Sequence, residues 1–211
     1  PEATIIDGGM NGSCVLMING EDEDTILDGF TLTNGSGWFS GTVWLGGGLV
    51  VRNSSNPQLT NLIVTNNTAT AGVDPAGGGI SIGLNSDPYL ENVVISENES
   101  AWGGGISIFQ SSPTLHDVII SGNHATLTGG GMYIVDDASP SIENAQIFEN
   151  SANYYGGGIY VMMNSYPTFS HVTVTENVCA VGGGMITYHN TGPLVTHSII
   201  LGEYTRSNFA V

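Results

Sequence analysis

Three consecutive glycines recur along this chain at a nearly constant interval. The triplets begin at Gly46, Gly77, Gly103, Gly129, Gly156 and Gly182, with spacings of 31, 26, 26, 27 and 26 residues. Two further markers keep the same register. They are a proline (Pro57, Pro88, Pro113, Pro140, Pro167, Pro193) and an asparagine (Asn67, Asn98, Asn123, Asn150, Asn177). A period of this length indicates an array of stacked structural repeats.

Each repeat contains short segments in which apolar and other residues alternate. Ile80-Ser81-Ile82 follows one glycine triplet, and Val93-Val94-Ile95 follows the next proline. Alternation of period two is typical of a β-strand with one buried face. Such a unit cannot bury its apolar face alone, but it can pair with its copies in the repeats before and after it. The sequence therefore predicts an all-β fold, a single-stranded parallel β-helix of about seven coils of about 26 residues, forming one domain over residues 1–211.

The markers and the longest spacing have physical explanations in such a stack. Asparagines at one corner can hydrogen-bond to their copies above and below, so we expect Asn123 to stack between Asn98 and Asn150. Glycine runs permit a tight corner where a Cβ would clash. The spacing of 31 residues predicts an outward loop around residues 70–76.

Three stretches resemble bacterial right-handed parallel β-helix repeat proteins. "FENSANYYGGGI" (148–159) is similar to repeats of the polymorphic outer-membrane proteins. Residues 4–37 resemble the opening coils, and residues 197–203 a closing coil, of pectate-lyase-like secreted β-helix proteins. The resemblance implies right-handed coiling and an extracellular or cell-surface location. Because the chain begins at Pro1, we also expect it to be a piece of a larger secreted protein.

The chain is acidic and carries few charged residues. Only 10% of residues are charged, and 19 acids stand against Arg52, Arg206 and no lysine, giving a net charge of −17. This charge opposes binding to nucleic acid and to anionic membranes. No apolar run reaches the roughly 18 residues that a membrane span requires, so membrane insertion is not expected. The oligomeric state stays open.

Two groups of acidic residues are candidates for a metal-binding or catalytic site. Glu21, Asp22, Glu23 and Asp24 form a run in a predicted turn, where carboxylates could bind Ca²⁺ or could simply be solvated. No other cofactor is expected. Asp136 and Asp137 follow the strand Met132–Ile134 and are weak candidates for the acid pair of a glycosidase. The Gly-His-Gly and Arg-x-Lys motifs that the resemblance to polygalacturonases would imply do not occur, so a turn is the simpler interpretation.

The strand after each glycine triplet is predicted to direct aromatic side chains outward. We expect an exposed ligand-binding face made by Phe109, Tyr133, Tyr160, Met162 and Tyr188. Aromatic rings with a polar tip suit glycans or protein partners, although strand propensity alone also favours Tyr and Phe.

The leading hypothesis is therefore a secreted or cell-surface β-helix scaffold. It would act as an adhesin that binds a glycan or a surface protein, more in the manner of a binding module than of an enzyme. Two alternatives stay open. One is a carbohydrate-active enzyme, a polysaccharide lyase or a glycoside hydrolase, or a fragment of one; the other is a purely structural stalk.

Overall fold

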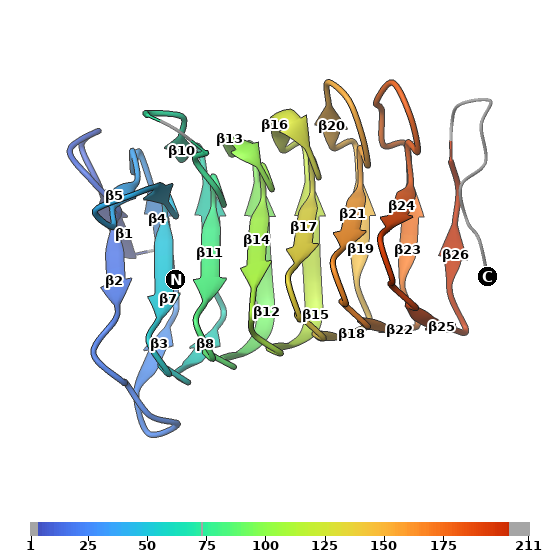
Figure 1. Cartoon of the computed structure of the whole chain (residues 1–211). Coiled ribbons are helices and arrows are strands. Elements are labelled where there is room, and N and C mark those ends of the chain that lie inside the picture. Colours follow the sequence, from blue (N-terminus) through green and yellow to red (C-terminus); the bar gives the residue numbers. More distant parts are fainter. Residues whose placement is uncertain (1–3, 73, 203–211) are drawn as a thin grey trace.

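The computed structural model describes residues 4–72 and 74–202 and has the predicted architecture. These residues form a β-solenoid of about seven turns, with about 49% of the chain in strands and no helix. Strands of successive coils lie side by side along one axis (Figure 1). Within the described part there is accordingly no helix that could cross a membrane.

One parallel sheet, called the GGG sheet below, contains the six strands that follow the glycine triplets and, at its N-terminal end, β2 (Val15–Met17). Its seven strands are, in spatial order, β2 (Val15–Met17), β7 (Leu49–Arg52), β11 (Ile80–Gly83), β14 (Ile106–Phe109), β17 (Met132–Val135), β21 (Ile159–Met162) and β24 (Met185–Tyr188). Equivalent residues pair directly, as Ile80 does with Ile106. Side chains at equivalent positions therefore form columns along the stack.

A second parallel sheet, the long sheet, contains thirteen strands and bends at a corner within each coil. Before the corner lie β3 (Ile26–Asp28), β8 (Gln58–Thr60), β18 (Ser141–Glu143), β22 (Thr168–Ser170) and β25 (Leu194–Thr196). After it lie β1 (Thr4–Asp7), β4 (Phe30–Thr33), β9 (Ile63–Thr65), β19 (Gln146–Phe148), β23 (Thr173–Thr175) and β26 (Ile199–Ile200). In two coils, β12 (Tyr89–Ser96) and β15 (Thr114–Ser121) run through the corner without a break.

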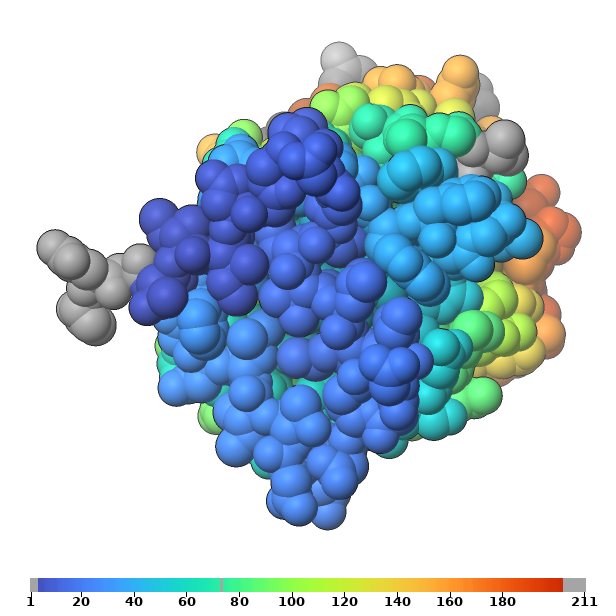
Figure 2. Space-filling model, turned by 90° about the vertical axis from the view of Figure 1, so that its left-hand side faces the viewer, coloured from blue at the N-terminus to red at the C-terminus, as the bar shows by residue number. Residues whose placement is uncertain are grey.

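A third, short sheet consists of β10 (Thr68–Ala69), β13 (Glu99–Trp102), β16 (His124–Thr128) and β20 (Ser151–Ala152). The first coils also carry an antiparallel hairpin, β5 (Trp38–Phe39) and β6 (Trp44–Leu45). Seen along the axis from the N-terminal coils, the light-blue segment around residue 40 stands out from one side of the stack (Figure 2). The sequence did not predict this hairpin.

Left-handed residues turn the chain at the corner of the long sheet. Asn92 has a φ of 53° and lies between Leu90 and Val93, both of which point into the core and are almost fully buried. Without the turn, strict alternation would direct those two side chains to opposite faces. Asn61, Asp117, Asn144, His171 and His197 occupy the same left-handed position in other coils. His171 and His197 are therefore corner residues of the last two coils.

The predicted asparagine ladder is present inside the stack. Asn67, Asn98, Asn123, Asn150 and Asn177 are all at most 1% exposed. The side-chain amide of Asn98 donates to Asn123 Oδ1 at 3.0 Å, and that of Asn123 donates to Asn150 Oδ1 at 2.9 Å. Each ladder oxygen thus accepts from the coil before it, so adjacent coils are joined at a buried corner.

A serine ladder, which the sequence analysis missed, joins the coils after the GGG sheet. The backbone amide of Ser55 donates to Ser86 Oγ, and that of Ser86 donates to Ser111 Oγ, each at 3.1 Å. Ala138 interrupts the column, which resumes where its amide donates to Ser165 Oγ at 3.2 Å. The interruption leaves the Ser111 amide without the hydroxyl acceptor that its counterparts have.

Close packing between coils explains the glycine triplets. The first glycine of the second triplet, Gly77, has a φ of 72°, a left-handed value that is costly for other residues. A methyl group on the middle glycine, Gly78, would lie 2.5 Å from the carbonyl oxygen of Glu99 and would also strike that of Gly104. The triplet therefore repeats because the turn and the close approach of the next coil repeat.

Candidate functional site

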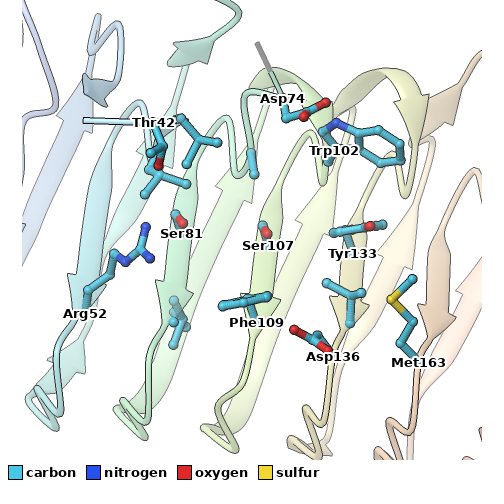
Figure 3. Close-up of a pocket in the computed structure, with 16 residues that line it drawn as sticks. Thr42, Arg52, Asp74, Ser81, Trp102, Ser107, Phe109, Tyr133, Asp136 and Met163 are labelled. Atoms are coloured by element: carbon cyan, nitrogen blue, oxygen red, sulfur yellow. The ribbon is translucent and has the colours of Figure 1, made fainter. Parts of the chain in front are cut away.

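A groove lies on the outer face of the GGG sheet, across β7, β11, β14 and β17. Its cavity has a volume of about 510 Å³. Figure 3 shows Ser81, Ser107 and Tyr133 in a row across three neighbouring strands, with Arg52 at one end of the groove. Volumes of this size are typical of sites for small molecules.

Small residues create the floor of the groove. The column of outward positions Val50, Ser81, Ser107 and Tyr133 is small in its two middle coils. The neighbouring column reads Arg52, Gly83, Phe109, and its middle member has no side chain. The hollow therefore results from two coils with short side chains between coils with long ones.

Aromatic rings form the end of the groove. The rings of Trp102 and Tyr133 lie 5.4 Å apart between centroids, and Tyr133 stacks on Tyr160 at 5.7 Å with an interplanar angle of 10°. Phe109 lies half-buried in the same lining. Burial raises the pKa of Tyr133 well above its ordinary value, which keeps the phenol neutral over the physiological range.

The predicted aromatic face is only partly the one observed. Phe109 and Tyr133 line the groove, but Tyr160 is only 8% exposed because its ring packs against Tyr133 and Tyr155. Met162 accepts a weak hydrogen bond from the Tyr133 hydroxyl at 3.7 Å and lies outside the cavity lining. Tyr188 is 55% exposed and packs edge-on against His189, also outside it. The expectation that Tyr160 is exposed is therefore wrong.

Two insertions wall the groove on the side of the short sheet. Thr42 and Val43 come from the turn of the β5–β6 hairpin, and Asp74 comes from the predicted outward loop. Figure 3 shows Thr42 and Asp74 above the row of floor residues. The hairpin contains none of the repeated markers, so its position beside a site could not be predicted from the sequence.

Asp136 lies in the lining, whereas Asp137 does not. Both have a φ of 61°, so they make the predicted turn after β17. The Gln110 side chain donates to Asp136 Oδ2 at 3.1 Å. Asp136 therefore combines a turn position with access to the groove.

The acidic run Glu21–Asp24 does not act as a single group. Glu21 Oε2 accepts a hydrogen bond from Ser55 Oγ at 2.7 Å, at the start of the serine ladder. Burial acts to raise the pKa of Glu21, but the hydrogen bonds from Ser55 and from backbone amides lower it overall. Asp22 accepts from the backbone amide of Asp24 within the turn. Calcium binding at this run stays a prediction.

A separate cluster occupies the corner of the long sheet. Among the described residues, the group of three potential metal ligands whose atoms all lie within 4.8 Å is Glu91, His116 and Asp117. His116 Nδ1 lies 3.9 Å from Glu91 Oε1 and 3.1 Å from Asp117 Oδ2. The imidazole thus lies close to both carboxylates, and all three side chains are partly solvent-accessible.

Comparison with known proteins identifies the fold family. The family model described as "Right handed beta helix region" matches residues 4–200. The chain belongs to the right-handed β-helix family. No curated protein and no solved structure matches it. Membership of this family determines the architecture and the handedness, but one fold can carry many functions, so the ligand has to be inferred from the groove.

Proposed function

We propose that this β-helix protein is a carbohydrate-binding module and that the groove on its GGG sheet is the binding site. The observation that carries the proposal is the cavity of about 510 Å³ lined by Trp102, Phe109 and Tyr133 above a floor of serines. The proposal keeps the extracellular or cell-surface location that the sequence resemblance implies.

The chemistry of the lining suits a sugar. Pyranose rings present apolar C–H faces and polar hydroxyl groups, and aromatic rings offer large flat surfaces with polar tips. The hydroxyl groups of Ser81 and Ser107 form no side-chain hydrogen bonds within the described part of the chain and point into the groove in Figure 3. They can therefore bond to sugar hydroxyls. Specific sites of this kind usually combine an apolar lining with a few such polar groups.

A glycan array with purified protein tests the proposal. We expect binding to a small set of glycans, and Trp102→Ala and Tyr133→Ser should each weaken it by at least about tenfold, since buried aromatic contacts dominate binding energies. Tyr166→Ser is the matched control because Tyr166 is 46% exposed and lies outside the lining. Equal losses in all three variants, or no binding to any glycan, would remove the proposal.

Hydrolysis of the bound glycan is a second candidate function. Two carboxylates, those of Asp74 and Asp136, line the same cavity. Most glycosidases act through a pair of carboxyl groups. Incubating the protein with the glycans that it binds and measuring new reducing ends separates the two candidates. If new reducing ends form with the unmodified protein but not with Asp136→Asn, the protein is a glycosidase and not a binding module.

A further inference from the structure

Arg52 is the only lysine or arginine that the structure describes, and it lies in the groove. The side chain leaves the end of β7, and its guanidinium points along the groove toward Ser81 (Figure 3). Within residues 4–72 and 74–202, no carboxylate forms an ion pair with it; the ion pairs found there are those of His116. In a chain with 19 acidic residues, none of the described carboxylates lies within ion-pair distance of the one described arginine.

The guanidinium is also partly removed from water. Arg52 is half-buried, and this burial lowers the pKa of its guanidinium, although an arginine stays charged at any physiological pH. A desolvated charge is costly unless an opposite charge or several hydrogen bonds compensate it. The planar guanidinium offers paired donors that match the two oxygens of a carboxylate or a sulfate. An oxyanion that enters the groove would therefore provide this compensation.

The space for that oxyanion lies beside Arg52. Gly83 is the paired residue on the next strand, and Phe109 is the one after it. At a strand spacing of about 4.8 Å, the Cα atoms of Arg52 and Phe109 are separated by about 10 Å. The glycine between them leaves a narrow notch with a cation on one side and the Phe109 ring on the other; the ring leans toward Gly83 and lies 3.6 Å from the position that an added Cβ would take. A sugar on Phe109 can direct a substituent into this notch.

We propose that the groove selects a mostly neutral glycan carrying an isolated oxyanion, a carboxylate or a sulfate ester, which binds to Arg52 in front of Gly83. This inference rests on the proposed function. A densely charged polymer is disfavoured for two reasons. Two carboxylates, those of Asp74 and Asp136, line the same cavity, and the net charge of −17 repels a polyanion. A glycan with one anionic sugar among neutral ones therefore fits a groove with one arginine and two carboxylates.

The test uses an array in which each backbone occurs in neutral, singly carboxylated, singly sulfated and fully carboxylated versions. We expect singly charged versions to bind about 10- to 100-fold more tightly than neutral ones, as for a charge-assisted hydrogen bond, and fully charged versions to bind less well than singly charged ones. The carboxylated and sulfated arms identify which oxyanion is preferred. In Arg52→Gln the ratio between singly charged and neutral affinities should fall to about one.

A second variant separates the notch from general electrostatics. Gly83→Val fills the notch, retains Arg52 and places a residue with high strand propensity in a strand, although its Cβ would lie 3.3 Å from the Phe109 carbonyl oxygen, so Phe109 has to move slightly. It should also abolish the preference for the singly charged version, and thermal melting confirms that it is folded. Neutral binding without a charge preference in the unmodified protein, or a preference that survives Arg52→Gln, overturns this inference alone. Absence of binding to every version overturns it together with the proposed function.

Discussion

Asn123 donates twice to one atom of Asn150: its side-chain amide and its backbone amide bond to Asn150 Oδ1 at 2.9 and 3.0 Å. The same pair of bonds reaches Asn123 Oδ1 from Asn98. Each ladder asparagine therefore satisfies two donors that are buried in the coil before it. The stability of the stack depends on these bonds, because a buried donor without a partner is costly.

Asn123→Leu should lower the free energy of unfolding by about 1–3 kcal/mol or more, because it leaves both Asn98 donors without their acceptor. Denaturant unfolding measures the loss. Asn153→Leu is the control: Asn153 also donates to a carbonyl of the coil before it, that of Thr126 at 3.0 Å, but it is solvent-exposed, so water can replace this bond and stability should change by less than about 0.5 kcal/mol. Equal stability of Asn123→Leu and the unmodified protein would contradict a structural role for the ladder.

Ala138→Ser should stabilise the protein by about 0.5–1.5 kcal/mol, because the new hydroxyl would continue the serine ladder and accept the Ser111 amide. The site has room, since serines occupy the equivalent positions in neighbouring coils. Val174→Thr is the contrasting variant. It adds a hydroxyl to a fully buried apolar column and should destabilise the protein. A loss of stability in Ala138→Ser would show that the column is not an interrupted ladder.

Gly78→Ala should be among the most damaging single substitutions, since its methyl group would meet backbone atoms of the next coil that cannot move independently. A loss of at least about 2 kcal/mol is expected in denaturant unfolding. Gly192→Ala is the control, because Gly192 is exposed and its added methyl would lie 3.4 Å from the Tyr166 ring, an ordinary contact. Similar stabilities of the two variants would exclude close packing as the reason for the triplet.

The lowered pKa of Glu21 predicts that the stability of the folded protein depends on pH in the acidic range. Its folded-state pKa lies below the ordinary value of 4.5, so its contribution to stability is complete above about pH 4.5. That contribution is lost as the pH falls further, through the folded-state pKa. Melting temperatures between pH 6 and pH 2 should therefore decline less steeply in Glu21→Gln than in the unmodified protein. Parallel curves would contradict a stabilising role for the bond from Ser55.

The coils could be predicted from the sequence period because each coil makes the same contacts with the coils before and after it. The glycine, proline and asparagine markers each correspond to a repeated contact, such as the Asn123–Asn150 bond, and a repeated contact leaves a repeated residue. The serine ladder was missed because Ala138 interrupts it and because serine is common in turns.

The groove was harder to predict, because it depends on where the repeat is broken. The sequence predicted a binding face from outward-facing aromatic side chains. The hollow itself is formed by the smallest residues in the same columns, Ser81, Gly83 and Ser107. One wall is a hairpin around Thr42 that has no counterpart in other coils. Arg52 belongs to no repeated marker, and only the pairing of β7 with β11 in the fold places it in the groove.

The most direct test of the central claim is to map the bound glycan by backbone amide chemical shifts. The protein would be labelled with ¹⁵N and titrated with the best ligand from the array. We predict that the largest shifts fall in β11 and β14, at Ser81, Gly83, Ser107 and Phe109, and at Trp102 and Tyr133 beside them. Shifts confined to the long sheet, for example around Glu91 and His116, would show that the groove is not the binding site.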